Sequence, residues 1–412
     1  SAGIAAAAHL LLLHLERGSR IDAVVLRAAM EHAFGGSDAA GAWDWKTAYD
    51  ACEAATVLFM RKFGPTIRAR AATPAAELSM LGRIAALLPT HTRRSEESQA
   101  LQQFSTPLAL GLVAASAAAI TPADLVLEPS AGTGLLAIFA ELAGSGLVLN
   151  ELAESRAALL RRLFPRAATT RYDAAHIHDH LDDAVRPSVV LMNPPFSAAA
   201  HVDGTVADAA LRHVASALAR VAEGGRLVAI TAASLSPDQP SWREAFVRLQ
   251  ERGRVVFSAA VDGRVYARHG TTVETRLTVI DRVPADDPRS FPASPGMAPD
   301  VATLLQWVTS NVPLRLPVDG TAALRAPVHP VAVRPSRRPA QQPLAVAGSS
   351  LERAGTELAY ETVDWKPAEG GSLTEALYEG YDLQSIRIAG ARPHPTRLVQ
   401  SAAMASVAPP KP

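Results

Sequence analysis

The spacing of apolar positions changes twice along the chain. Residues 1–100 carry Ala- and Leu-rich stretches at helical spacing, separated by Gly35-Gly36 and Thr73-Pro74. The stretches fall at 4–16, 22–34, 43–63 and 74–88. This pattern predicts an α-helical N-terminal domain over residues 1–100, in which no chemistry is evident.

From 101 to 282, short apolar runs alternate with longer helical patterns. The runs that we interpret as strands are 125–127, 147–150, 169–172, 189–192, 226–231, 255–260 and 274–281. The helical patterns are 107–119, 135–143, 153–164, 207–221 and 242–252. Such alternation predicts a parallel sheet covered on both faces, with a final antiparallel pair. We therefore expect an α/β fold with a Rossmann-like seven-stranded sheet.

After residue 283 proline becomes frequent and the periodicity fades. Residues 283–349 are expected to hold a helix near 298–309 and a Pro-rich linker. Arg334, Arg337 and Arg338 could contact phosphates, but a solvated linker is the better explanation. Residues 350–412 form a mixed, irregular C-terminal extension.

Composition narrows the class of protein. Of the 412 residues 48% are hydrophobic, and 40 basic side chains balance 40 acidic ones, so nucleic-acid contact would need a local patch. The single cysteine, Cys52, excludes an internal disulfide and a cysteine-built zinc site, and fits a cytoplasmic location. The apolar run 4–15 is too short to span a bilayer, so no membrane partner is expected. The chain starts on Ser1 and ends on Ala-Pro-Pro-Lys-Pro, which suggests a fragment of something longer.

A glycine loop, Glu-Pro-Ser-Ala-Gly-Thr-Gly at 128–134, follows the first predicted strand. Gly132 and Gly134 let the backbone approach a ligand. The loop lacks the Gly-Lys-Ser/Thr ending of a triphosphate loop, and the acid Glu128 suits a cationic sulfonium amino acid better than a pyrophosphate. Glu151, at the end of the second strand, has the spacing of an acid that binds ribose hydroxyls, and Asp173 could accept from an adenine amino group. The simpler alternative is an ordinary strand–helix turn.

A rigid corner, Asn-Pro-Pro-Phe at 193–196, follows the fourth predicted strand. An exocyclic amine is a poor nucleophile because its lone pair is delocalised into the ring. The Asn193 amide oxygen and the Pro194 carbonyl could accept both of its hydrogens, while Pro194 and Pro195 stiffen the corner. Phe196 could stack on the target base, which must first be flipped out of a duplex. A proline-rich strand exit is the alternative.

Three further features have weaker signals. In Phe104-Ser105-Thr106-Pro107, Thr106 could cap the next helix or lie over a cofactor. Tyr266 could form a second aromatic wall or be a surface tyrosine. The histidines at 176, 178 and 180 match no common zinc pattern, so we expect a solvated loop there and no metal.

In the order of these parts, residues 101–282 resemble class I S-adenosylmethionine (SAM)-dependent methyltransferases of the N6-adenine DNA type. The resemblance implies a seven-stranded SAM-methyltransferase sheet and SAM as cofactor. It implies the catalytic residues Asn193, Pro194, Pro195 and Phe196, with Phe196 also at the substrate. Tyr266 is a further substrate-binding candidate from its place in the loop between the last two strands. It implies the cofactor-binding residues Phe104, Thr106, Pro107, Glu128, Pro129, Ser130, Ala131, Gly132, Gly134, Glu151, Asp173 and Asn193.

Two departures matter. The Pro-rich stretch does not resemble the family's target-recognition domain, which leaves sequence specificity open. The acids Glu151 and Asp173 are common to most SAM enzymes, so they do not select the substrate.

The tail from Ile388 resembles the segment leading into the helicase core of bacterial strawberry-notch-like proteins. Those large chains can join a methyltransferase-like front to a superfamily 2 helicase-type ATPase. The resemblance implies nucleic acid, DNA in the first place, as a partner, and an ATPase domain beyond residue 412. No Gly-Lys-Thr loop or Asp-Glu box is present, so this chain alone is not expected to hydrolyse ATP.

Three functions stay open. The first is transfer of the SAM methyl group to N6 of adenine in DNA, which the Phe-Ser-Thr-Pro element favours. The second is methylation of an RNA base or a protein glutamine; the helical first hundred residues are compatible with the glutamine option. The third is a non-catalytic SAM-fold module that docks a larger helicase on nucleic acid.

Overall fold

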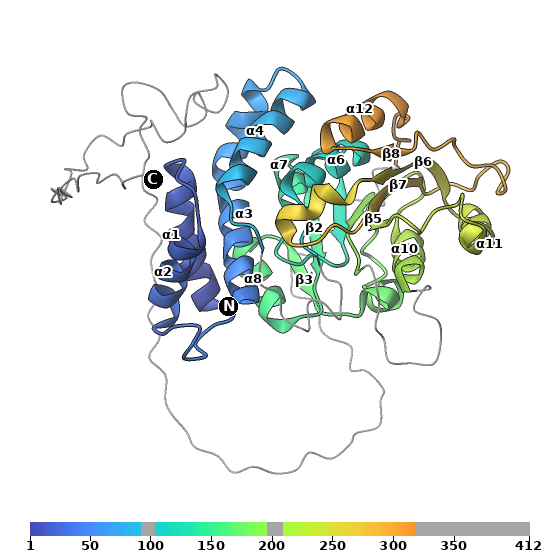
Figure 1. Cartoon of the computed structure of the whole chain (residues 1–412). Helices are drawn as coiled ribbons and strands as arrows, with labels where there is room; N and C mark the ends of the chain where they lie inside the picture. The colour runs from blue at the N-terminus through green and yellow to red at the C-terminus, as the bar shows by residue number, and fades with distance from the viewer. Residues whose placement is uncertain (92–103, 196–208, 319–412) are drawn as a thin grey trace, which may run out of the picture.

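A mixed β-sheet forms the centre of the protein (Figure 1). The computed structural model describes residues 1–91, 104–195 and 209–318. Within these residues the sheet has eight strands in the order β3-β2-β1-β4-β5-β7-β6-β8. The strands are β1 (Leu125–Glu128), β2 (Gly146–Asn150), β3 (Ala168–Thr170), β4 (Val189–Met192), β5 (Arg226–Ala232), β6 (Arg254–Val261), β7 (Thr275–Asp281) and β8 (Met297–Ala298).

The strand order places a topological switch point between β1 and β4. The first five strands are parallel, while β7 is antiparallel to both β5 and β6. The prediction of an α/β fold with a Rossmann-like sheet and a terminal antiparallel pair is confirmed. The eighth strand is an addition: β8 has two residues, too few for any sequence periodicity, and pairs with β6. Ligands of such sheets bind beyond the carboxyl ends of the strands at the switch point.

Both faces of the sheet are covered, so its central strands are buried throughout. Alternate side chains of β1 enter different apolar clusters, Val126 on one face and Leu125 and Leu127 on the other. The first face is covered by α6 (Leu108–Ala118), α7 (Ala137–Leu142), α8 (Glu154–Leu163) and α12 (Val301–Asn311). The second is covered by α9 (Ile177–His180), α10 (Ala209–Arg220) and α11 (Pro240–Gln250).

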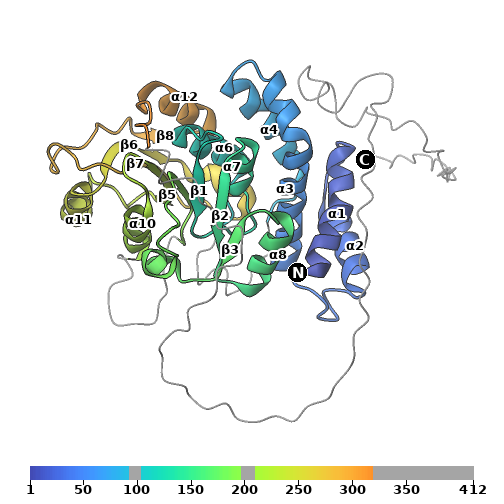
Figure 2. The same ribbon diagram turned by 180° about the vertical axis from the view of Figure 1, so that it is seen from behind.

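The N-terminal residues form four helices beside the sheet. They are α1 (Ala2–Glu16), α2 (Ala23–Phe34), α3 (Trp45–Arg70) and α4 (Pro74–Leu87). Asp22, Asp44 and Thr73 cap α2, α3 and α4 through their side chains. The helix α3 contacts α7 and α8, and Figures 1 and 2 show it between α1 and the sheet. Apolar side chains of these helices belong to the same continuous cluster as the first face of the sheet.

One local expectation is wrong, and several others fall outside the described residues. The segment expected to be a solvated loop around His176, His178 and His180 is instead a short helical pair, η1 (Ala174–His176) and α9, although the three histidines are exposed. Phe196, the Pro-rich stretch and the tail lie outside the described residues. Among the helices described, none is long and apolar enough to cross a membrane.

Candidate active site

A cavity lies at the carboxyl ends of β1, β2 and β4, at the switch point of the sheet. It brings together most of the residues that the sequence singled out. Those that line it are Phe104, Thr106, Glu128, Pro129, Ser130, Ala131, Gly132, Glu151, Asp173, Asn193, Pro194 and Pro195. The glycine loop and the Asn-Pro-Pro corner therefore share one cavity.

Of the predicted site residues that the structure describes, three do not line this cavity. Pro107 immediately precedes α6, and Gly134 serves packing, because a Cβ there would lie 2.4 Å from Phe164 Cε2. Gly134 also has a φ of +91°, which only glycine adopts without strain. Tyr266 lies in η3 (Gly263–His269) and is fully buried, which corrects both its predicted roles, the aromatic wall and the surface tyrosine.

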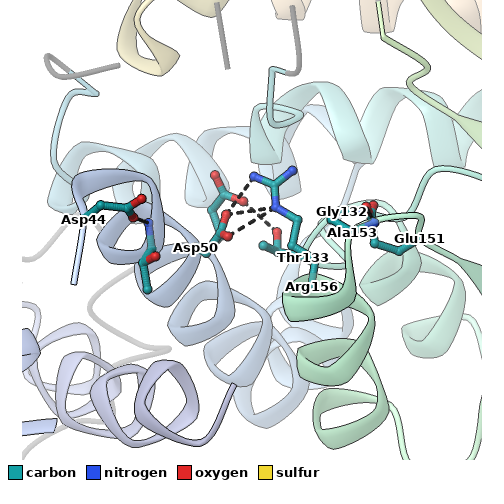
Figure 3. Close-up of polar contacts among 9 residues, drawn as sticks. Asp44, Asp50, Gly132, Thr133, Glu151, Ala153 and Arg156 are labelled. Carbon is teal, nitrogen blue, oxygen red and sulfur yellow. Dashed lines mark hydrogen bonds and ion pairs between the residues drawn. The ribbon is translucent and has the colours of Figure 1, made fainter. Parts of the chain in front are cut away.

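Glu151 holds the glycine loop in place. Its Oε2 accepts from the Gly132 amide at 2.9 Å and its Oε1 from the Ala153 amide at 2.8 Å (Figure 3). Gly132 has a φ of +55°, so its left-handed backbone turns the amide toward this carboxylate. Each carboxylate oxygen keeps a second lone pair for a ligand. The residue singled out as a ribose acid is thus also a structural element of the loop.

Asn150 is a residue that the sequence reasoning missed. This buried side chain ends β2 and donates from Nδ2 to the carbonyls of Pro129 and Tyr172, at 2.8 and 2.9 Å. Its Oδ1 accepts from Thr170 and from the Tyr172 amide. The side-chain amide of Asn150 therefore links the glycine loop to the ends of β2 and β3. The sequence feature that could have identified Asn150 is a polar residue at the end of an apolar strand.

Glu128 is a buried carboxyl group with an unsatisfied oxygen. Among the described residues its Oε2 has no hydrogen-bond partner. Burial holds the pKa of Glu128 well above its ordinary value; the Ala137 amide opposes this shift and the charge of Glu151 adds to it. A cationic ligand group in the cavity would supply the partner that this carboxylate lacks.

Asn193 is held by the Phe-Ser-Thr-Pro segment. Its Nδ2 donates to the Phe104 carbonyl at 3.1 Å and to Thr106 Oγ1 at 2.9 Å. Because a backbone carbonyl only accepts, these contacts fix which end of the amide is nitrogen. The expected helix cap at Thr106 is wrong: Pro107 precedes the first turn of α6 without a side-chain cap, and the Thr106 hydroxyl serves Asn193 instead.

The amide oxygen of Asn193 is left with open acceptor capacity. Oδ1 is buried and has no partner at hydrogen-bonding geometry within the described residues. Tyr266 also interacts with the Asn193 side chain, which opposes the rise that burial causes in the tyrosine pKa. An amide oxygen has two lone pairs, so Oδ1 can accept from a ligand donor. The corner thus presents a fixed, desolvated acceptor.

The helix α3, in the region where no chemistry was evident, contributes acids that bind residues lining the cavity. Arg156 lines the cavity and forms a bidentate ion pair with Asp50, with Nη2 to Oδ1 at 2.7 Å (Figure 3). One turn further, Glu53 accepts from Thr133 Oγ1, in the glycine loop, at 2.6 Å. The N-terminal helices therefore brace the glycine loop directly, a role that their sequence did not reveal.

His213 on α10 also lines the cavity and was missed by the sequence reasoning. Burial lowers the pKa of this histidine, while the nearby Asp173 opposes the shift. Its Nδ1 has no hydrogen-bond partner in the part of the chain that the structure describes. Asp173 itself accepts from the Ala175 amide at 3.0 Å and caps η1.

The fold and the site together define an α/β protein with a ligand cavity at the switch point of a mixed sheet, between a glycine loop and an Asn-Pro-Pro corner. No protein-family model and no curated protein matches the sequence. Among solved structures, it is similar to a proposed class I SAM-dependent methyltransferase from Listeria monocytogenes. That match has 10% identity and a TM-score of 0.44, and covers 76% of this chain and 97% of that one.

Two other solved structures show a similar level of likeness. A modification subunit of a proposed type I restriction enzyme from Vibrio vulnificus has 16% identity and a TM-score of 0.38, with 52% of this chain and 54% of that chain covered. A proposed RNA methyltransferase from Pyrococcus horikoshii has 17% identity and a TM-score of 0.34, with 47% and 92% covered. At these levels the function has to follow from the site itself.

Proposed function

We propose that the cavity binds SAM and that the protein transfers its methyl group to a nitrogen held at Asn193. The observation that carries this proposal is the Asn193 side chain. Its nitrogen is bonded to Phe104 and Thr106, while its buried oxygen keeps acceptor capacity at the cavity. A buried acceptor without a partner is costly unless a ligand supplies the donor.

The other residues that line the cavity suit the cofactor. Glu128 would face the cationic methionine part, Glu151 the ribose hydroxyls, and Asp173 together with Tyr172 the adenine. SAM supplies an electrophilic methyl group on a positively charged sulfur. The unsatisfied, desolvated carboxyl of Glu128 is the feature that favours a cationic ligand over a phosphate.

At the corner, Asn193 Oδ1 and the Pro194 carbonyl would accept the two hydrogens of an exocyclic amine. These bonds favour a tetrahedral nitrogen whose lone pair faces the methyl group. Pro194 and Pro195 fix the backbone, so positioning replaces a strong base. The proton on nitrogen is lost after methyl transfer, when the alkylated amine is acidic.

The substrate that we propose is N6 of adenine in DNA, with Phe196 stacking on the flipped base. The supporting observation is the direct bonding of the Phe-Ser-Thr-Pro segment to the corner. Methylation of an RNA base or of a protein glutamine is the second candidate, because the same corner would hold the NH₂ group of either one. From the resemblance of the tail, we also propose that a helicase-type ATPase domain follows residue 412 in the same polypeptide.

The test is methyl transfer from labelled SAM to adenine-containing DNA, RNA and protein, with the methylated product identified by mass spectrometry. We expect N6-methyladenine in DNA. Asn193→Ala should lower kcat by about 100-fold or more while SAM affinity, measured by calorimetry, stays within a few-fold. Asn311→Ala, an exposed amide on α12, is the matched control.

Two outcomes would decide against this function. SAM binding without transfer to any of the three substrates would favour the non-catalytic docking module. Transfer at an undiminished rate by Asn193→Ala would remove the corner from the mechanism.

A further inference from the structure

Three metal-ligating side chains from distant segments meet beside the cavity. Glu53 on α3, His91 in the segment after α4 and His269 at the end of η3 each place one ligand atom within 4.8 Å of the others. A backbone hydrogen bond holds two of these segments together: the His91 amide donates to the carbonyl of Arg268, the neighbour of His269, at 2.8 Å. The His91 ring stacks on Tyr49 with centroids 4.0 Å apart, which limits its orientations.

His269 offers a ring nitrogen of the kind that binds metals. Its Nδ1 is buried and has no hydrogen-bond partner among the described residues. The rings of His91 and His269 are in edge contact, with centroids 5.2 Å apart. Metal ions bind neutral imidazole through this kind of free nitrogen lone pair.

Charge near the cluster also favours a cation. Arg156 is committed to Asp50 through three hydrogen bonds of 2.7 to 3.2 Å. The buried Glu53 has hydroxyl partners, Thr133 and Ser105, and feels the charge of Arg156. A buried carboxyl group beside two imidazoles is a ligand set that a divalent ion would complete.

We propose that Glu53, His91 and His269 bind one divalent transition-metal ion, with Zn²⁺ as the ion that suits two imidazoles and a carboxylate. With metal–ligand distances near 2.0–2.1 Å, tetrahedral ligands lie about 3.3 Å apart. Separations of up to 4.8 Å therefore need only small side-chain rotations to close. His91 and His269 are partly exposed, which gives the ion a route from solvent.

The ion would join three parts of the molecule. It links α3, the segment after α4 and η3, which also contains Tyr266, a residue that interacts with Asn193. The site thus clamps the N-terminal helices onto the sheet beside the glycine loop. It differs from the expectation of no metal, and from the exposed histidines at 176–180. The inference is independent of the proposed methyl transfer.

The experiment uses the whole chain, stripped with a chelator and titrated with Zn²⁺ in a calorimeter and with Co²⁺ in a spectrophotometer. We expect one equivalent of either ion, with the intense visible absorption of four-coordinate Co²⁺. Saturating Zn²⁺ should raise Tm by about 3–8 °C, and a chelator should reverse the shift.

Variants locate the ion. His269→Ala and His91→Ala should each weaken Zn²⁺ binding by at least about tenfold and remove the visible cobalt spectrum. His178→Ala, which changes an exposed histidine on α9, is the control and should bind like the wild type. Circular dichroism checks folding; if His269→Ala does not fold, His91→Ala decides.

Three results would overturn the assignment. They are a wild-type chain that binds less than one equivalent, unchanged binding in the folded ligand variants, or loss of binding in His178→Ala. The last result would place the ion at the 176–180 histidines instead.

Discussion

The corner at Asn193 and the contact between α3 and Arg156 are both polar and largely buried, but they differ in how their hydrogen bonds are satisfied. At the α3 contact, both oxygens of Asp50 are bonded to one guanidinium. At the corner, the nitrogen of Asn193 is fully bonded while its oxygen keeps acceptor capacity. A paired group holds shape, whereas an oriented group with spare capacity is ready for a ligand. The same cavity therefore has a structural side and a receptive side.

The largest expected effect comes from breaking the structural side. Asp50→Ala leaves Arg156 buried without its carboxylate; the two side chains are only 6% and 12% exposed. We expect a loss of about 3–5 kcal/mol in the free energy of unfolding, measured by urea denaturation. Asp50→Ala combined with Arg156→Met should recover part of this loss, because the uncompensated charge is gone.

Glu244→Ala is the control for this prediction. It removes an exposed ion pair between Glu244 and Arg289, in which the two side chains are 63% and 70% exposed. The free energy of unfolding should change by about 1 kcal/mol or less. An equal effect of the two substitutions would show that the α3 contact is not a structural element of the cavity.

Glu151→Gln tests a residue that belongs to both sides of the comparison. Its carboxylate accepts from the Gly132 and Ala153 amides, and an amide group cannot replace both acceptors. Since the loop would loosen and a ribose acceptor would be lost, SAM affinity should fall by about tenfold or more, measured by calorimetry. The control is Glu154→Gln, three residues on, with a side chain that is 80% exposed. Equal SAM affinities in wild type and Glu151→Gln would place this acid outside the binding site.

Thr106→Val tests the receptive side alone. Valine keeps the shape of threonine but removes the oxygen that accepts from Asn193 Nδ2 at 2.9 Å. The Asn193 amide would retain only its Phe104 partner and rotate more freely, so kcat should fall by about tenfold with a smaller change in SAM affinity. Steady-state kinetics and calorimetry separate the two effects. Thr309→Val, on the remote helix α12, should match the wild type, and a purely affinity-based loss at Thr106 would contradict the positioning role.

The fold was predictable where the sequence pattern is local. The strands at 125–128 and 189–192 are apolar runs with clear ends, and the carboxyl ends of parallel strands necessarily meet at one edge. That geometry is why the glycine loop and the Asn-Pro-Pro corner were expected to share a cavity. The two-residue β8 had no such pattern.

The rest of the site depends on contacts between distant positions. Asp50 and Arg156 are 106 residues apart and Glu53 and Thr133 are 80 apart, so no periodicity within a helix or strand reveals either pair. Acids on α3 read as an ordinary polar face of an amphipathic helix. Their role follows only once α3 lies against α7 and α8.

The smallest expected effect is a pH dependence at Glu128. Burial, the largest cause, holds the pKa of this carboxyl well above its ordinary value of 4.5. Because the folded-state pKa is the raised one, the bound proton stabilises the fold at acid pH. This stabilisation is lost as the pH rises from about 4.5 through the folded-state pKa. Glu128→Gln stays neutral, so its Tm should exceed that of the wild type by an amount that grows with pH.

The measurement is Tm between about pH 5 and pH 8 for both proteins, with Glu274→Gln, an exposed acid beside β7, as control. A cationic ligand should also pull the proton from Glu128. SAM binding to the wild type should therefore release protons, seen as a calorimetric enthalpy that depends on the buffer, and Glu128→Gln should lose this dependence. Parallel Tm curves together with buffer-independent binding would show that Glu128 carries no proton for the ligand to displace, which would contradict its raised pKa.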